Sequence, residues 1–263
     1  MALISFKGEH LVDHLTLTAS LFDKTYGRSY AKLLANRFSI PEAYEDVYKL
    51  LKLTCLLHDI GKALQGYQLQ KDHTSFPFHE VPSAFIFNTI VKQHFYKHLN
   101  LVTLCSIAIL VHHQAMRNLN TLIEKHDDII GTLSKKLGLP KSIDIDNDLE
   151  ELSLAIKRHT KIDVYAEQVK ELLAKLEIRD LSLLINGLVE QYLQTKISGT
   201  EISLWEPLIA APLQLCDNLA ASLLRPEGSP LSRKLAYEAL RLLSSKADLL
   251  YLKKEELKSY QLI

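Results

Sequence analysis

Apolar residues recur every three or four positions along most of this chain, which is the spacing of one face of an α-helix. The pattern predicts helices over residues 9–24, 43–58, 81–98, 101–115, 163–176, 180–194, 203–224 and 230–258. Glycines and prolines fall mostly near the ends of these segments, and only short stretches such as residues 1–6 read as strand. The expected fold class is therefore all-α, a helical bundle with additional helices.

The composition indicates a globular chain with a large core. The chain has 263 residues, and 47% of them are hydrophobic. No uninterrupted apolar run reaches the roughly 18 residues of a membrane span, and residues 1–10 lack the apolar core of a signal peptide. A chain of this length can form one large domain or two small ones. We take residues 1–263 as a single domain, located in the cytoplasm and with no membrane partner.

The charge balance argues against a protein that holds nucleic acid unaided. The 31 basic and 31 acidic residues cancel, whereas such domains are usually basic on one face. Any basic face must be local, or a partner must supply it. The charges are densest in residues 117–162, which is either a partner-binding or strand-guiding insertion or a solvated helical excursion. We favour the solvated excursion.

Histidines and aspartates stand in a distinctive order along the chain. They are His14, the doublet His58-Asp59, His79, the doublet His112-His113, and Asp217. Each doublet closes an apolar helical run, and adjacent helical residues point about 100° apart. One doublet can therefore address two metal ions, or its carboxylate can bridge them. Each residue taken alone has an ordinary structural or surface role, but the whole set indicates a metal centre.

Some members of this set are singled out by their surroundings. Asp217 lies in a strongly apolar helix, where a charge is costly unless it is paired or bound to a metal. His14 lies beside the buried stripe of its helix, whereas His10 is nearer the end and is expected to be exposed. Lys62 follows His58 by four residues, so a continuing helix would place it on the same side. It is predicted to contact a phosphate or to stabilise developing charge, the alternative being a surface lysine.

The ligand types indicate which metals the centre would bind. Several imidazoles favour Mn²⁺, Fe²⁺, Co²⁺, Ni²⁺ or Zn²⁺, whereas Mg²⁺ prefers oxygen ligands. A closed structural zinc site needs four ligands, and this set offers seven candidates. The three cysteines, Cys55, Cys105 and Cys216, are isolated and are predicted to be buried thiols. We expect two divalent ions, Mn²⁺ or another transition metal, with Mg²⁺ as an alternative.

The ordered set resembles the HD superfamily of metal-dependent phosphohydrolases, and most closely the HD nuclease of type I CRISPR interference. The matching stretches are His14-Leu15, Leu57 to Lys62, His79-Glu80 with Ser83-Ala84, Leu110 to His113, and Cys216 to Ala220. They cover most of residues 10–116 and resume near 205–225. The downstream His-His pair is the specific part, because many HD enzymes share the first doublet.

The resemblance implies an HD-domain fold with two metal ions. One ion would be held by His14, His58, Asp59 and Asp217, and the second by Asp59, His79, His112 and His113. The family cleaves nucleic-acid phosphodiester bonds through two-metal activation of water, with a preference for single-stranded DNA, and RNA is an alternative substrate. Asp59 and Lys62 are the expected catalytic residues.

The resemblance also implies partners. Many family members are fused to a superfamily-2 helicase, and this sequence contains no G-x-x-x-x-G-K-[ST] phosphate loop. We therefore expect a standalone nuclease subunit that works with a separate CRISPR-associated helicase and the guide-RNA surveillance complex in antiviral defence. The alternatives are an HD phosphohydrolase acting on a nucleotide or cyclic nucleotide, and a helical interaction subunit with a degenerate metal site.

Overall fold

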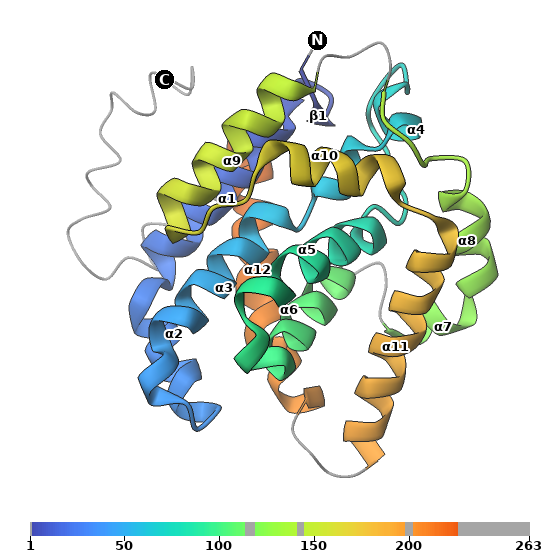
Figure 1. Ribbon diagram of the computed structural model, residues 1–263. Helices are drawn as coiled ribbons and strands as arrows, with labels where there is room; N and C mark the ends of the chain where they lie inside the picture. Colours follow the sequence, from blue (N-terminus) through green and yellow to red (C-terminus); the bar gives the residue numbers. More distant parts are fainter. Residues whose placement is uncertain (1, 114–118, 141–144, 198–201, 226–263) are drawn as a thin grey trace.

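The computed structural model describes residues 2–113, 119–140, 145–197 and 202–225, and within them it is almost entirely helical (Figure 1). The elements are, in chain order, β1 (Ile4–Phe6), β2 (Glu9–His10), α1 (Leu11–Thr25), α2 (Gly27–Arg37), η1 (Pro41–Ala43), α3 (Tyr44–Leu57), η2 (Ile60–Ala63), α4 (Gln65–Gln68), α5 (Glu80–His94), η3 (Tyr96–His98), α6 (Leu99–Val111), α7 (Leu119–Glu124), α8 (His126–Leu133), α9 (Asp146–Thr160), α10 (Ala166–Lys175), α11 (Ile178–Ile197) and α12 (Ile202–Leu224). The η elements are short 3₁₀ turns.

Two helices form the centre of the molecule because they are apolar on nearly every side. Every residue from Leu50 to Leu57 in α3 is buried, and so is every residue from Leu104 to Val111 in α6. A helix that is apolar all round is stable only inside a core. α3 packs against α1, α2, α5 and α6, while α6 packs against α5 and α12. Both C-terminal ends are therefore surrounded by other helices.

The beginning and the late part of the described chain meet beside these central helices. α1 and α12 pack against each other, and α12 also contacts α3 and α6. α9 packs against α1 and α3, and α10 packs on α9 (Figure 1). The strands β1 and β2 form a small antiparallel hairpin in which Phe6 pairs with Glu9. This hairpin leads directly into α1.

The helix predictions are confirmed for most segments, with three differences. Residues 9–10 are strand, and the predicted helix over 81–98 ends at His94, after which the chain bends by 114° into η3 and α6. α2 was not predicted because its sequence is mostly polar, and only Gly27, Ala31, Leu34 and Ala35 are buried, where it meets α3. The predicted helix over 230–258 lies outside the described residues.

The described parts of the charged segment 117–162 are largely helical but are not simply solvated. They contain α7, α8 and α9, and α9 buries Leu149, Leu152 and Ile156 against α1 and α3. The expectation of a solvated excursion is therefore wrong for α9. α9 is an amphipathic helix: its charged residues occupy the outer face and its apolar face packs in the core. The high charge content of the segment made this apolar face hard to recognise in the sequence.

α12 departs from the expected placement of prolines. Prolines were expected mostly near the ends of helical segments, but both Pro207 and Pro212 lie inside α12. The stretch Glu206–Leu224 is long and apolar enough to cross a membrane, as is the bent pair of α5 with η3 and α6. Core helices of globular proteins share these properties, and 56% of the Glu206–Leu224 window is buried in this structure.

Candidate metal centre

The two doublets stand at the C-terminal ends of the two central helices. His58 directly follows α3, and His112 directly follows α6. In both rings Nδ1 donates to the carbonyl oxygen three residues earlier, that of Cys55 at 2.8 Å and that of Ile109 at 2.6 Å. The last carbonyls of a helix have no intrahelical partner, so these bonds cap the helix and fix the ring. Each Nε2 remains available toward the space between the helix ends.

His79 reaches the same space from the start of α5. It immediately precedes the helix, and its Nδ1 donates to the Phe76 carbonyl at 2.6 Å. The close approach depends on Gly61, because a Cβ there would lie 2.3 Å from the His79 carbonyl oxygen. The Gly61 N–H donates to Ser83 Oγ at 2.8 Å. The turn that follows Asp59 is thereby held directly against the beginning of α5.

The packing of α1 on α12 supplies the remaining members. His14 is fully buried on α1, and its Nε2 lies 2.9 Å from Asp217 Oδ1 on α12. The same Asp217 oxygen lies 3.5 Å from His58 Nε2. The packing of α12 on α1 therefore places Asp217 beside His58, although the two residues are far apart in the sequence.

Asp59 lies between two sets of histidines. Its Oδ1 is 2.7 Å from His79 Nε2 and 3.5 Å from His112 Nε2. Its Oδ2 is 3.4 Å from His14 Nε2 and 3.7 Å from His58 Nε2. Each carboxylate oxygen faces different imidazoles, which is the arrangement that a bridging carboxylate requires.

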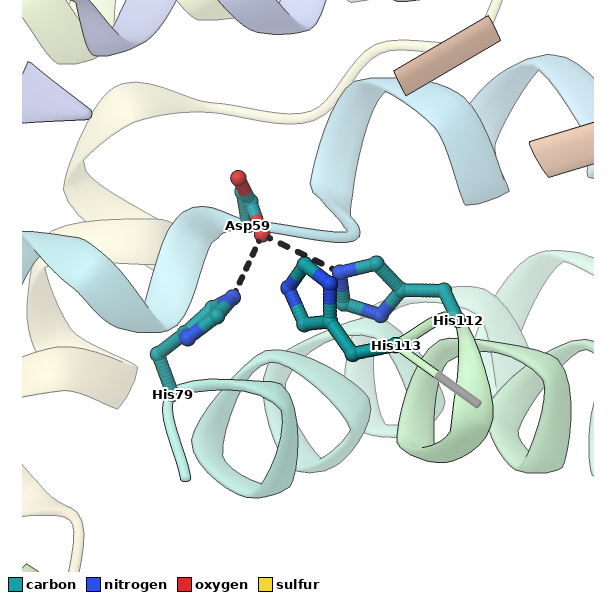
Figure 2. A group of neighbouring side chains, drawn as sticks. All are labelled: Asp59, His79, His112 and His113. Carbon is teal, nitrogen blue, oxygen red and sulfur yellow. Dashed lines mark hydrogen bonds and ion pairs between the residues drawn. The ribbon is translucent and has the colours of Figure 1, made fainter. Parts of the chain in front are cut away.

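The candidate ligand atoms fall into two groups that share Asp59. In each group all ligand atoms lie within 4.8 Å of one another, the first being His14, His58, Asp59 and Asp217, and the second Asp59, His79, His112 and His113. Figure 2 shows the second group, with His79 approaching Asp59 from one side and His112 from the other. Across the described ranges, no other set of three or more His, Cys, Asp or Glu side chains comes as close together.

The donor chemistry of both groups fits divalent transition metals. Nε2 of His14, His58 and His112 is buried and makes no hydrogen bond. Burying an unpaired polar atom is costly, so three such atoms facing one pair of carboxylates require a further partner. Imidazole nitrogen combined with carboxylate oxygen is a donor set for Mn²⁺, Fe²⁺, Co²⁺, Ni²⁺ or Zn²⁺. The His/Asp cluster could therefore hold a metal ion.

The carboxylates are ionised despite their burial. Burial alone would raise the pKa of Asp59, but Lys62 and the neighbouring His58 and His79 outweigh it and hold this pKa well below its usual range. Burial would likewise raise the pKa of Asp217, yet the neighbouring imidazoles of His14 and His58 keep it well below the usual value. The site thus presents two negative charges to a cation.

The histidines differ in their affinity for protons. Burial would lower the pKa of His14, but Asp217 and Glu9 raise it to about 9. For His113, burial followed by repulsion from His112 and His79 lowers the pKa to about 2. Without metal, His14 thus binds a proton far more readily than His113 does.

Lys62 is part of the cluster but not in the way that a continuing helix predicts. After Asp59 the chain tightens into the 3₁₀ turn η2, so Lys62 is aligned with Asp59 rather than with His58. Its Nζ lies 2.6 Å from Asp59 Oδ2 and 3.2 Å from Ser5 Oγ. The residue is only 5% exposed, so the alternative of a surface lysine is wrong.

Several neighbouring or similar residues lie outside the cluster. The side chain of His10 is exposed. Asn218, which follows Asp217 in the sequence, lies on the exposed side of α12. Glu80 is fully buried, but its nearer oxygen is 3.5 Å from His79 Nδ1, which bonds to a backbone carbonyl instead. The doublet His126-Asp127 lies away from the site, with the Asp127 side chain fully exposed.

Sequence reasoning missed one buried acid. Glu9 is 1% exposed, and its Oε1 accepts a hydrogen bond from His14 Nδ1 at 2.6 Å. The only local signal is an acidic residue five positions before His14. Its second partner, Arg225, is 216 positions away in the chain, so no local pattern reveals the pairing.

Known proteins share both the sequence pattern and the fold. A family model described as "Cas3, HD domain" matches residues 8–189. The chain belongs to the Cas3 HD domain family. It is 27% identical over 239 residues to the CRISPR-associated endonuclease Cas3-HD of Saccharolobus solfataricus, which covers 86% of this chain and 90% of that protein. Its fold is similar to that of the CRISPR-associated Cas3 HD domain protein from Methanocaldococcus jannaschii, with a TM-score of 0.56 and 19% identity over 81% of this chain and 99% of that one.

These matches confirm the all-α HD-domain fold and support a CRISPR-associated nuclease of the HD type. The family match covers every residue of the His/Asp cluster except Asp217. The place of Asp217 therefore rests on its contacts with His14 and His58 in the structure.

Proposed function

We propose that this chain is a metal-dependent nuclease that cleaves phosphodiester bonds of single-stranded DNA in CRISPR defence, with RNA as a second substrate. The observation that carries the proposal is the position of Asp59, whose two oxygens face two separate sets of imidazoles. Family membership and the Cas3-HD endonuclease relative support the reaction class.

The two groups would each hold one divalent ion. His14, His58 and Asp217 would bind one, and His79, His112 and His113 the other, with Asp59 shared between them. Two such ions supply water activation at neutral pH and offset negative charge on a phosphoryl group. Mn²⁺ and the other imidazole-binding ions are the proposed occupants, with Mg²⁺ able to substitute.

The surrounding residues would keep this centre in place. The carbonyl bonds of His58, His79 and His112 hold their rings with Nε2 toward the cluster, so little reorganisation is needed on binding. Lys62 offsets the charge of Asp59 and, at 2.6 Å from it, is close enough to contact a phosphate bound there. We propose that Lys62 contributes charge stabilisation in this way.

A separate helicase subunit and the guide-RNA surveillance complex are the proposed partners. The zero net charge of the chain supports this, because the enzyme itself offers little nonspecific attraction to a polyanion. A partner that delivers the strand would provide the missing affinity.

The experiment that tests the proposal is cleavage of end-labelled single-stranded and duplex DNA with Mn²⁺, Mg²⁺ or EDTA. We expect Mn²⁺-dependent cutting of the single strand by the wild type and none by Asp59→Ala. Asp127→Ala is the matched control, because it alters the other His-Asp doublet on an exposed surface. Cleavage by Asp59→Ala at the wild-type rate would contradict the proposed centre. Hydrolysis of free nucleotides without cutting of DNA would move the substrate to small phosphoesters.

A further inference from the structure

A buried carboxylate lies directly behind His14, on the side of the ring away from the cluster. Glu9 Oε1 is 2.6 Å from His14 Nδ1, and both side chains are completely buried. The corresponding Nδ1 atoms of His58, His79 and His112 bond to backbone carbonyls. Of these four rings, His14 is held by a charged acceptor, which forms a stronger hydrogen bond than a carbonyl.

The other oxygen of Glu9 is bound at the far end of α12. Glu9 Oε2 accepts a hydrogen bond from Arg225 Nε at 3.0 Å, and the Arg225 guanidinium lies 4.1 Å from the Phe6 ring centroid. Phe6 pairs with Glu9 in the β1–β2 hairpin. One carboxylate therefore joins the hairpin, the helix of His14 and the end of the helix that carries Asp217.

The cost of burying this carboxylate argues that it has a role in the site. An ionised carboxylate inside a protein is stable only when it is paired and hydrogen-bonded. Here the pairs are Arg225, which is one-third exposed, and His14, whose other nitrogen faces the candidate metal group. A carboxylate on the outer nitrogen of a metal-binding histidine fixes the ring and makes it a better donor.

We propose that Glu9 is a positioning residue for the group formed by His14, His58, Asp59 and Asp217. Together with Arg225 it fixes α1 and α12 relative to each other, so that His14 and Asp217 meet at the spacing that this group requires. The inference rests on the proposed metal centre, and its test must separate the two.

The test is the affinity of metal-free protein for Mn²⁺, measured by calorimetric titration of wild type and Glu9→Gln. The substitution keeps the shape of the side chain and removes its charge. We expect one site to weaken by about 10- to 100-fold while the other keeps its affinity. Asp13→Asn is the matched control, since Asp13 is an exposed acid next to His14 and its loss should leave both sites unchanged. Substituting Co²⁺ should give an altered visible absorption spectrum in Glu9→Gln alone.

The outcomes distinguish failure of the inference from failure of the centre. A wild type that binds no metal contradicts the proposed centre and the inference with it. A wild type that binds two ions while Glu9→Gln binds both equally well overturns the positioning role alone. If Glu9→Gln does not fold, Glu9→Asp decides, because it keeps the charge but shortens the reach to His14. Weaker binding at one site then supports the role, and unchanged binding overturns it.

Arg225→Gln tests the second half of the inference. It leaves the contact of Glu9 with His14 in place and removes the link to α12. We expect a smaller loss of affinity at the same site than Glu9→Gln causes. Unchanged affinity would show that Arg225 does not help to fix α12.

Discussion

At the scale of single residues, burial determines which histidines belong to the site. His14, His58 and His112 are completely buried and face carboxylates, whereas His10 and His126 are at least partly exposed. Sequence alone suggested this division for His14 and for the doublets, because apolar neighbours indicate burial. His159 lies outside the site, near Lys52 and Asp23.

His159 should make the stability of the metal-free protein depend on pH. Burial, followed by the nearby charge of Lys52, lowers the pKa of His159 to about 4 from 6.5. The unfolded chain therefore binds a proton between these values that the folded protein does not, so the free energy of unfolding falls as pH drops from 6.5 to 4. The ring is only half-buried and solvent screens it, so we expect this contribution to be about 1 kcal/mol.

Urea unfolding of EDTA-treated wild type and His159→Gln at pH 7 and pH 4.5 measures this contribution. The cluster histidines titrate in both proteins, so the difference between them isolates His159. The wild type should lose more stability than the variant on going to pH 4.5. Equal losses would show that His159 is not held neutral by its surroundings.

At the scale of elements, the site depends on how closely η2 approaches α5. A side chain at position 61 would meet the His79 carbonyl oxygen at 2.3 Å and the Ser83 nitrogen at 2.9 Å, and both are backbone atoms that cannot easily move. Gly61→Ala should separate Asp59 from His79, which destabilises the protein by roughly 1–3 kcal/mol and weakens Mn²⁺ binding.

Gly131→Ala is the matched control for Gly61→Ala. Gly131 lies in α8, and nothing would contact an added Cβ within 4 Å. Alanine is the better helix former there, by about 0.5–1 kcal/mol. Thermal unfolding with and without Mn²⁺ measures both variants. A Gly61→Ala protein with wild-type stability and metal affinity would refute the close-approach argument.

α12 carries Asp217 in spite of two internal prolines, and Tyr30 helps to compensate for one of them. Pro212 has no N–H, so the carbonyl of Leu208 one turn earlier loses its intrahelical partner. The Tyr30 hydroxyl donates to that carbonyl at 2.6 Å. Tyr30→Phe should therefore cost about 1–3 kcal/mol, because a partly buried carbonyl is left unsatisfied.

A double-mutant cycle tests this account of α12. In a Pro212→Ala background the residue 212 N–H can satisfy Leu208, so Tyr30→Phe should cost measurably less than in the wild type. Chemical denaturation of the four proteins gives the coupling. Identical costs in the two backgrounds would show that Tyr30 stabilises α12 by packing alone.

At the scale of the whole molecule, the site is assembled from elements that lie far apart in the sequence. The order of the histidines and aspartates, together with the apolar runs before them, was enough to predict the members of the cluster. Asp217 was predictable because its charge interrupts an apolar helix. Glu9 was not, since its role comes from contacts with residues 5 and 216 positions later in the chain. The pairing of Lys62 with Asp59 depended on a 3₁₀ turn that hydrophobic periodicity cannot reveal.

The most direct test of the central claim is the number of Mn²⁺ ions bound per chain by metal-free protein and its variants. We expect two ions for the wild type, one for His113→Ala, and a loss of affinity at both sites for Asp59→Asn, because Asp59 is shared by the two groups. A wild type that binds a single ion, or an Asp59→Asn protein that still binds two ions as tightly as the wild type, would contradict the shared two-metal centre.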